Sequence, residues 1–156
     1  MILEDVQTVV DYHYWARDRL LDACDPLTPD QFTRDLSSSF PSVRDTLVHL
    51  YTADWGWHRL WLGQSFDDPP TADSFPDLPS VRAAWLMQES QVRRYVANLG
   101  EDGVGRFWKM LLHLVNHASY HRGQVTMMLR QLGVDAPRSQ DMVVFYKECG
   151  RLPLAP

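Results

Sequence analysis

The sequence predicts an all-α protein, a four-helix bundle, and two observations lead to this prediction. Four segments of about 20 residues place apolar side chains at the i, i+3, i+4 spacing of an amphipathic helix. No segment shows the period-two alternation that is typical of a half-buried strand. With 156 residues, 45% hydrophobic and 22% charged, the chain has the length and composition of one globular domain, which we expect to span residues 1–156.

The first two helices are bounded by residues that cap or break helices. The first is predicted over residues 2–24, and the prolines of "DPLTPD" end it. Its apolar stripe consists of Val6, Val9, Val10, Leu20 and Cys24. The second is predicted to begin at "FPSVRD", where Ser42 can cap the helix and Asp45 takes the third helical position. It runs to Leu62, and Gly63 is the stop signal.

Two further helices follow a long connection, "QSFDDPPTADSFPDLP", which is rich in Pro, Asp and Ser and has no periodicity. The third helix is predicted over residues 80–99, ended by Gly100, and the fourth over residues 107–132, ended by Gly133. Only "GEDGVGR" separates these two helices, and the tail segment "SQDMVVFYKECG" is compatible with a final helical turn or two. Because a long connection can run the length of a bundle, we expect an up-down-down-up order with a crossover between the second and third helices.

Charge and composition exclude several classes of function. The net charge is -5 and no cluster of Lys and Arg exists, which argues against a nucleic-acid partner. The N-terminus "MILEDVQTVV" is acidic where a signal peptide would be basic, and no apolar run approaches membrane-spanning length. We therefore expect a cytoplasmic protein without a membrane partner. Its two cysteines are too few for a disulfide scaffold and are expected to be small core residues.

The stretch "LLHLVNHASYHRGQVTMMLRQLG" carries three of the six histidines, His113, His117 and His121, at intervals of four residues. Residues four apart share a helix face, so His117 and His121 can reach one metal ion. His113 lies one turn earlier, and the series drifts too far around the helix for all three to bind equally well. A third ligand would come from a facing helix, and His49 is the candidate. Three imidazoles with open positions would form a catalytic site.

Spacing alone leaves other interpretations open. A pair of histidines four residues apart on a helix is also common at protein surfaces, where it binds no metal. His49 on a partly apolar helix could equally be a hydrogen-bonded interior residue. From spacing and periodicity, metal binding is one hypothesis among these.

Several motifs along the chain together form a recognisable pattern. "NHASYHRGQ" followed by "LRQLG" is the most specific of them, and "YHYWARDRLL" gives the first helix a Tyr-x-x-Trp-Ala motif. "SFPSVRDTLVHLYTADWGW" leads into the second helix with its single histidine, and "PRSQDMVVFY" lies near the C-terminal end. These motifs resemble those of the DinB/YfiT-like family of metalloenzymes, and the resemblance covers nearly the whole chain. It implies that His49, His117 and His121 bind a divalent metal, that the fold is the up-down-down-up bundle, and that the protein is commonly a homodimer.

Two departures from the family pattern affect the site. The family often has a longer excursion between the third and fourth helices, and often has Asn in the first helix where this chain has His13 and Arg17. His13 could be a further ligand or general base, or a core histidine. Asp54 lies in an apolar stripe, where an unpaired carboxylate would be costly, so we expect it to pair with Arg17 or to orient a metal ligand. Asp45, one turn before His49, is a second candidate for orienting that ligand.

The resemblance implies a metal-dependent transferase or hydrolase that activates a low-molecular-weight thiol or a water molecule. Three imidazoles suit Zn, Ni, Fe, Cu or Co, so the metal stays open. The expected substrate is a small molecule. One alternative is a non-catalytic, dimeric metal-binding protein of a stress response. A helical interaction module without metal is a third hypothesis.

Overall fold

The computed structural model describes residues 2–151, with the side chain of residue 101 left out, and it confirms the all-α class. Four long helices form the bundle: α1 (Leu3–Cys24), α3 (Val43–Trp61), α4 (Leu78–Ala97) and α5 (Glu101–Gln131). Two short helices, α2 (Pro29–Thr33) and α6 (Met142–Glu148), and the 3-10 turn η1 (Ala72–Ser74) lie outside it. No strand occurs within residues 2–151.

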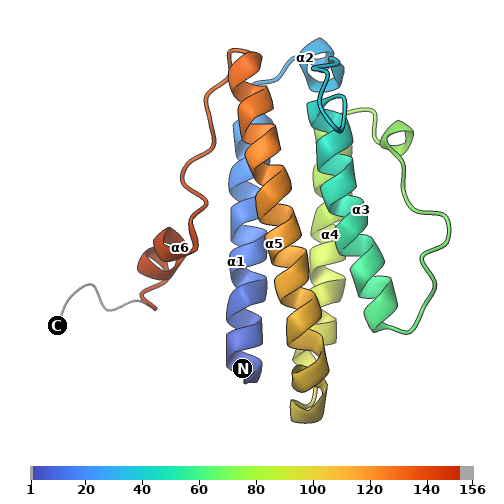
Figure 1. Ribbon diagram of the computed structural model, residues 1–156, viewed down its shortest axis with the longest axis vertical. Coiled ribbons are helices and arrows are strands. Elements are labelled where there is room, and N and C mark those ends of the chain that lie inside the picture. The colour runs from blue at the N-terminus through green and yellow to red at the C-terminus, as the bar shows by residue number, and fades with distance from the viewer. Residues whose placement is uncertain (1, 152–156) are drawn as a thin grey trace.

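The four long helices pack as a ring in which α1 and α3 each contact both α4 and α5. In Figure 1, α1 and α5 run upward from the end that carries the N-terminus, whereas α3 and α4 run downward. The segment between α3 and α4 returns along the outside of the bundle through η1, so two consecutive helices run parallel. α1 and α3 therefore lie on one diagonal of the ring, and α4 and α5 lie on the other.

Helix caps account for the start of α3 as predicted. The hydroxyl of Ser42 accepts a hydrogen bond from the backbone N–H of Asp45 over 3.1 Å. This side-chain acceptor satisfies one of the N–H groups that the first helical turn leaves without a partner. Gly63 follows the helix with a positive φ of 71° and ends it, also as predicted.

The sequence-based boundaries were wrong at two connections. α5 begins at Glu101, so most of "GEDGVGR" is helical, and Gly100 is the N-cap of α5, although we expected it to end α4. Burial of Val104 and Phe107 in the core stabilises the first two turns of α5 despite their two glycines. The short helix α2 was missed, although Thr28 and Gln31 form a capping box there with a proline at the first helical position.

The crossover and the tail both pack on the bundle through aromatic residues. Phe66 lies against Gly56 of α3, where a Cβ atom would come within 1.7 Å of its ring. Gly56 thus leaves room for the crossover. At the other side, the ring of Phe145 in α6 contacts Tyr12 and Trp15 of α1, with centroids 5.7 and 5.5 Å apart.

Within the described residues, no helix combines the length and hydropathy needed to cross a bilayer.

Candidate metal centre

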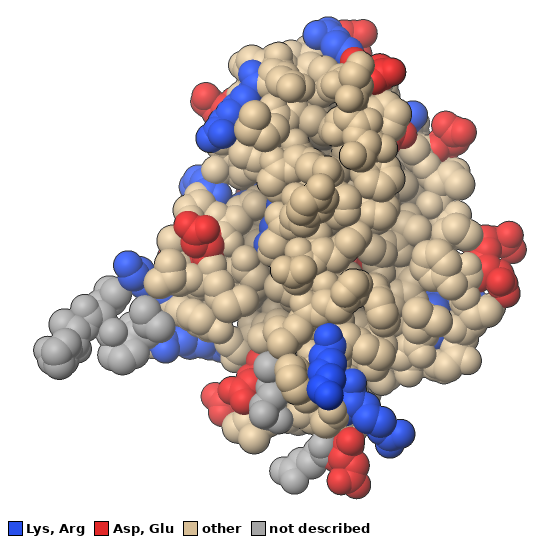
Figure 2. Space-filling model, viewed as in Figure 1, with Lys and Arg blue, Asp and Glu red and all other residues tan. Residues whose placement is uncertain are grey.

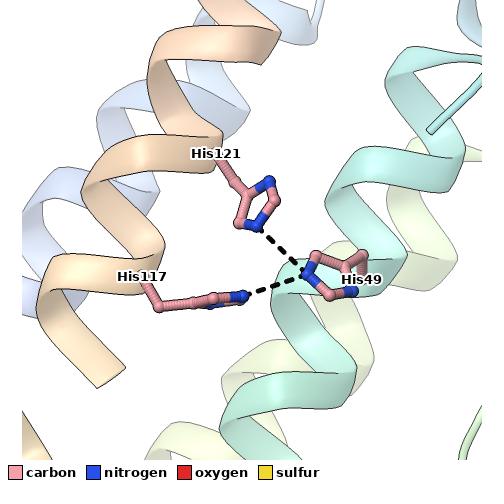
Figure 3. Close-up of side chains that lie close together, drawn as sticks. All are labelled: His49, His117 and His121. Atoms are coloured by element: carbon pink, nitrogen blue, oxygen red, sulfur yellow. Dashed lines mark hydrogen bonds between the residues drawn. The ribbon is translucent and has the colours of Figure 1, made fainter. Parts of the chain in front are cut away.

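Two helices bring three imidazoles together. His49 lies on α3, whereas His117 and His121 lie one turn apart on α5 and project from the same face of that helix. All three side chains point into the space between the two helices (Figure 3). The Nε2 atom of His49 lies 3.0 Å from that of His117 and 3.2 Å from that of His121. The structure thus places together the three histidines that the sequence predicted as ligands.

The spacing of these nitrogens fits a metal ion. Metal–imidazole bonds of about 2.0–2.1 Å in a tetrahedral arrangement separate the ligand nitrogens by about 3.3 Å. The nearest separations here, 3.0 and 3.2 Å, lie close to that value, and one nitrogen of each imidazole lies within 4.8 Å of the other two. A neutral imidazole has one N–H, so the proton of His49 cannot bridge to both neighbours at once. A cation at the centre would satisfy all three lone pairs.

Burial keeps two of the imidazoles neutral. Burial first, and then the neighbouring His121, His49 and His113 in that order, together lower the pKa of His117 to about 4. The pKa of His49 is also lowered, first by burial and then by the proximity of His121. At neutral pH both rings therefore carry a lone pair that could bind a metal.

Two neighbouring side chains hold the imidazoles in place. The ring of Phe40 stacks on His49 with centroids 4.0 Å apart and contacts His121 edge-on at 5.5 Å. The Nδ1 atom of His121 lies 2.7 Å from Oε1 of Gln124, three residues later on α5. Sequence reasoning missed both contacts. The spacing of Gln124 from His121 was a usable signal because residues three apart on a helix are neighbours.

His113 stays outside the cluster, as the drift around the helix suggested. The centroid of its ring lies 6.3 Å from that of His117. The ring packs edge-on against Trp57, with centroids 5.2 Å apart. The side chain is exposed. It is therefore not one of the three converging ligands.

The remaining candidates, His13, Arg17 and Asp54, lie in a separate polar group inside the bundle. Asp54 is fully buried and accepts hydrogen bonds from the Tyr14 hydroxyl at 3.3 Å and from Nε1 of Trp85 at 2.8 Å. The Nε2 atom of His13 lies 3.6 Å from the same carboxylate. Within residues 2–151, no hydrogen bond joins this group to the three converging imidazoles.

Two expected pairings were wrong. Arg17 forms ion pairs with Asp18 and Glu89, at 2.7 and 2.5 Å, so it is not the partner that the sequence suggested for Asp54. Asp45 bonds to Ser42 at the helix cap and does not orient His49.

The fold and the site together define a class: an all-helical protein that holds three imidazoles between two helices, where they could bind a metal ion. Comparison with known proteins agrees with this description. The model of the DinB family matches residues 3–148, and the chain belongs to the DinB family. It is 26% identical to the protein DinB of Bacillus subtilis over 156 aligned residues, which cover 86% of this chain and 91% of that protein.

Proposed function

We propose that this protein is a divalent-metal-dependent enzyme whose ligands are His49, His117 and His121. The convergence of three Nε2 atoms from two helices is the observation that carries the proposal. Three protein ligands leave at least one coordination position for a substrate or water, which is typical of catalytic sites. When bound, a divalent metal would lower the pKa of a water or thiol at that position.

The position of the cluster favours an exchangeable, catalytic ion over a structural one. His49 and His117 are only partly buried, so solvent and small molecules can approach them. The apolar core of the bundle is built separately, from side chains such as Val6, Leu47 and Leu111, and does not include the histidines. The fold therefore has a source of stability that is independent of the ion.

For the reaction we propose transfer or hydrolysis, with a low-molecular-weight thiol or water as the nucleophile. The protein's own thiols are poorly suited to this role. Cys24 is buried, as expected, and burial raises its pKa to about 12. The expectation of a core position was wrong for Cys149, which is exposed at the C-cap of α6, outside the four-helix bundle. The nucleophile would therefore come from solution. Phe40 and Trp57, beside His49 and His113, give the substrate an aromatic surface to pack against.

Metal analysis of the purified, metal-loaded protein tests the proposal. We expect one ion per chain, lost in His117→Ala, with the helical circular dichroism spectrum retained. His113→Ala is the matched control, because it removes an imidazole one turn away that is not in the cluster. The proposed site would be contradicted if the wild type bound no metal after incubation with Zn, Ni and Fe. It would also be contradicted if His117→Ala and His113→Ala lost equal amounts of bound metal.

The reaction class needs a second measurement. Metal-loaded protein would be assayed with several low-molecular-weight thiols, each paired with electrophiles, and with a series of esters. We expect consumption of a thiol or an ester that stops on addition of a chelator and in His117→Ala. If nothing is consumed and removal of the metal unfolds the protein, the alternative of a non-catalytic metal-binding protein is supported.

A further inference from the structure

We propose that Gln124 is a positioning residue for His121, a role that rests on the proposed function. Its amide oxygen accepts the hydrogen on Nδ1 of His121, which leaves Nε2 without a proton and directs that lone pair at the centre of the cluster. Gln124 lies at the Nδ1 edge of the His121 ring, whereas Nε2 of that ring faces His49.

The contact between the two side chains is short and local. The Nδ1 atom of His121 lies 2.7 Å from Oε1 of Gln124, and both residues lie on α5. A separation of three residues places Gln124 beside His121 on the helix surface, so the helix itself holds the pair together. The His121 side chain is buried, with 8% of its surface exposed, so water competes poorly for this bond.

The state of one proton decides whether His121 can bind a metal. A neutral imidazole carries its hydrogen on either Nδ1 or Nε2, and only the nitrogen without hydrogen can be a ligand. With the hydrogen on Nδ1, Nε2 presents its lone pair 3.2 Å from Nε2 of His49. If the amide nitrogen of Gln124 faced Nδ1, the hydrogen would sit on Nε2 and point at the other imidazoles. Because the Nε2 atoms of the three histidines converge, the arrangement with the hydrogen of His121 on Nδ1 is favoured.

His117 provides a contrast on the same helix. Its Nδ1 atom is buried, and no hydrogen-bond partner for it is found among the described side chains. The cluster therefore contains one ligand whose tautomer is held by the protein and a neighbour whose Nδ1 has no such partner. Loss of the Gln124 contact should weaken metal binding without abolishing it, because two ligands would be unaffected.

Zinc affinity of three variants tests this role, measured by competition with a chromophoric chelator. Gln124→Met removes the acceptor while keeping length and helix propensity, and we expect affinity to fall about 10- to 100-fold. Gln124→Glu keeps an acceptor and cannot donate, so we expect affinity equal to or above that of the wild type. Gln131→Met is the control, the same change at an exposed position on α5. We expect it to leave affinity unchanged.

The outcomes separate the two proposals. Wild-type affinity in Gln124→Met, or an equal loss in Gln124→Met and Gln124→Glu, would overturn the role of Gln124 while the metal site stands. A wild-type protein that binds none of Zn, Ni and Fe would overturn both.

Nitrogen NMR of the metal-free protein gives a second reading that does not depend on folding stability or activity. Long-range proton–nitrogen correlations report which ring nitrogen carries the hydrogen. We expect His121 to carry it on Nδ1 in the wild type and in Gln124→Glu, and to show a mixture of tautomers in Gln124→Met. A wild-type His121 protonated on Nε2 would overturn the proposal.

Discussion

Asp54 shows how the bundle accommodates a carboxylate that has no access to water. Its two oxygens accept hydrogen bonds from Tyr14 of α1 and Trp85 of α4, and His13 lies beside them. Burial first, and then the negative charge of Asp54, raises the pKa of Tyr14 well above its ordinary value. Tyr14 therefore stays a protonated donor at neutral pH, and Asp54 joins three helices at the centre of the bundle.

Glu89 should make part of the stability depend on pH. Burial raises the pKa of its carboxyl, but hydrogen bonds and charge from Arg93 and Arg17 outweigh that effect, and the net pKa is lowered. A carboxyl with a lowered folded pKa stabilises the protein above its unfolded pKa and loses that contribution as pH falls through the folded pKa. The stabilisation should therefore be present at pH 7 and disappear in the acidic range, below about pH 4.3.

Urea unfolding of Glu89→Gln at several pH values checks this prediction. We expect a lower free energy of unfolding than in the wild type at pH 7, and a difference that shrinks as pH falls. Asp67→Asn is the control, since this exposed carboxylate has no ion-pair partner among the described residues. A difference that stays constant from pH 7 to pH 3 would show that Glu89 acts through packing alone.

At the scale of single elements, three helices end in the same way. α3, α5 and α6 are followed by Gly63, Gly133 and Gly150, each with a positive φ between 65° and 75°. After α5, the N–H of Gly133 bonds to the carbonyl of Arg130, and that of Val134 bonds to the carbonyl of Leu129. These two bonds form a Schellman motif, which satisfies carbonyls that a helix end leaves free.

A pair of glycine substitutions on α5 tests this end structure. Gly133→Ala should lower the free energy of unfolding by about 1 kcal/mol or slightly more, because an L side chain is strained at positive φ. Gly105→Ala should raise it by about 0.5–1 kcal/mol, because Gly105 is helical and a Cβ atom there meets nothing within 4 Å. Urea unfolding of both variants measures the two changes. A change of the same sign in both free energies of unfolding would contradict the different backbone requirements of Gly133 and Gly105.

At the scale of the whole molecule, the outer face of α5 lacks charge over most of its length. Leu112, Tyr120 and Met127 are exposed there at intervals of eight and seven residues, so they form one stripe on the helix. The face seen in Figure 2 carries its Lys, Arg, Asp and Glu mainly along the rim. Two copies of such an uncharged stripe can meet without opposing like charges. We propose that the protein forms a homodimer through this stripe.

Sedimentation of the wild type and of two methionine variants tests the dimer. Met127→Glu should weaken association about tenfold or more, because it places a charge on each side of the contact. Met87→Glu introduces the same charge at another exposed position, on α4, and should leave association unchanged. A monomeric wild type would exclude the dimer, and an effect confined to Met87 would move the contact to α4.

The four long helices and most of their ends could be read from the sequence, whereas the short helix α2 could not. The ends of α1 and α3 were predicted within one or two residues, because caps and breakers such as Ser42 and Gly63 act locally. The start of α5 was misjudged by six residues, since Gly103 and Gly105 resemble a loop. Packing of Val104 and Phe107 overrides their poor helix propensity, and packing depends on partners distant in sequence.

By itself the sequence determined the four long helices, the family and the identity of three metal-ligand candidates, because periodicity, caps and a short motif are local patterns. Only the tertiary structure decided which side chains meet. In the folded protein Asp54 accepts hydrogen bonds from Tyr14 and Trp85. Arg17 forms an ion pair with Glu89, and His49 lies opposite His117. These contacts join different helices, and their distances follow from how the helices pack, which no local pattern specifies.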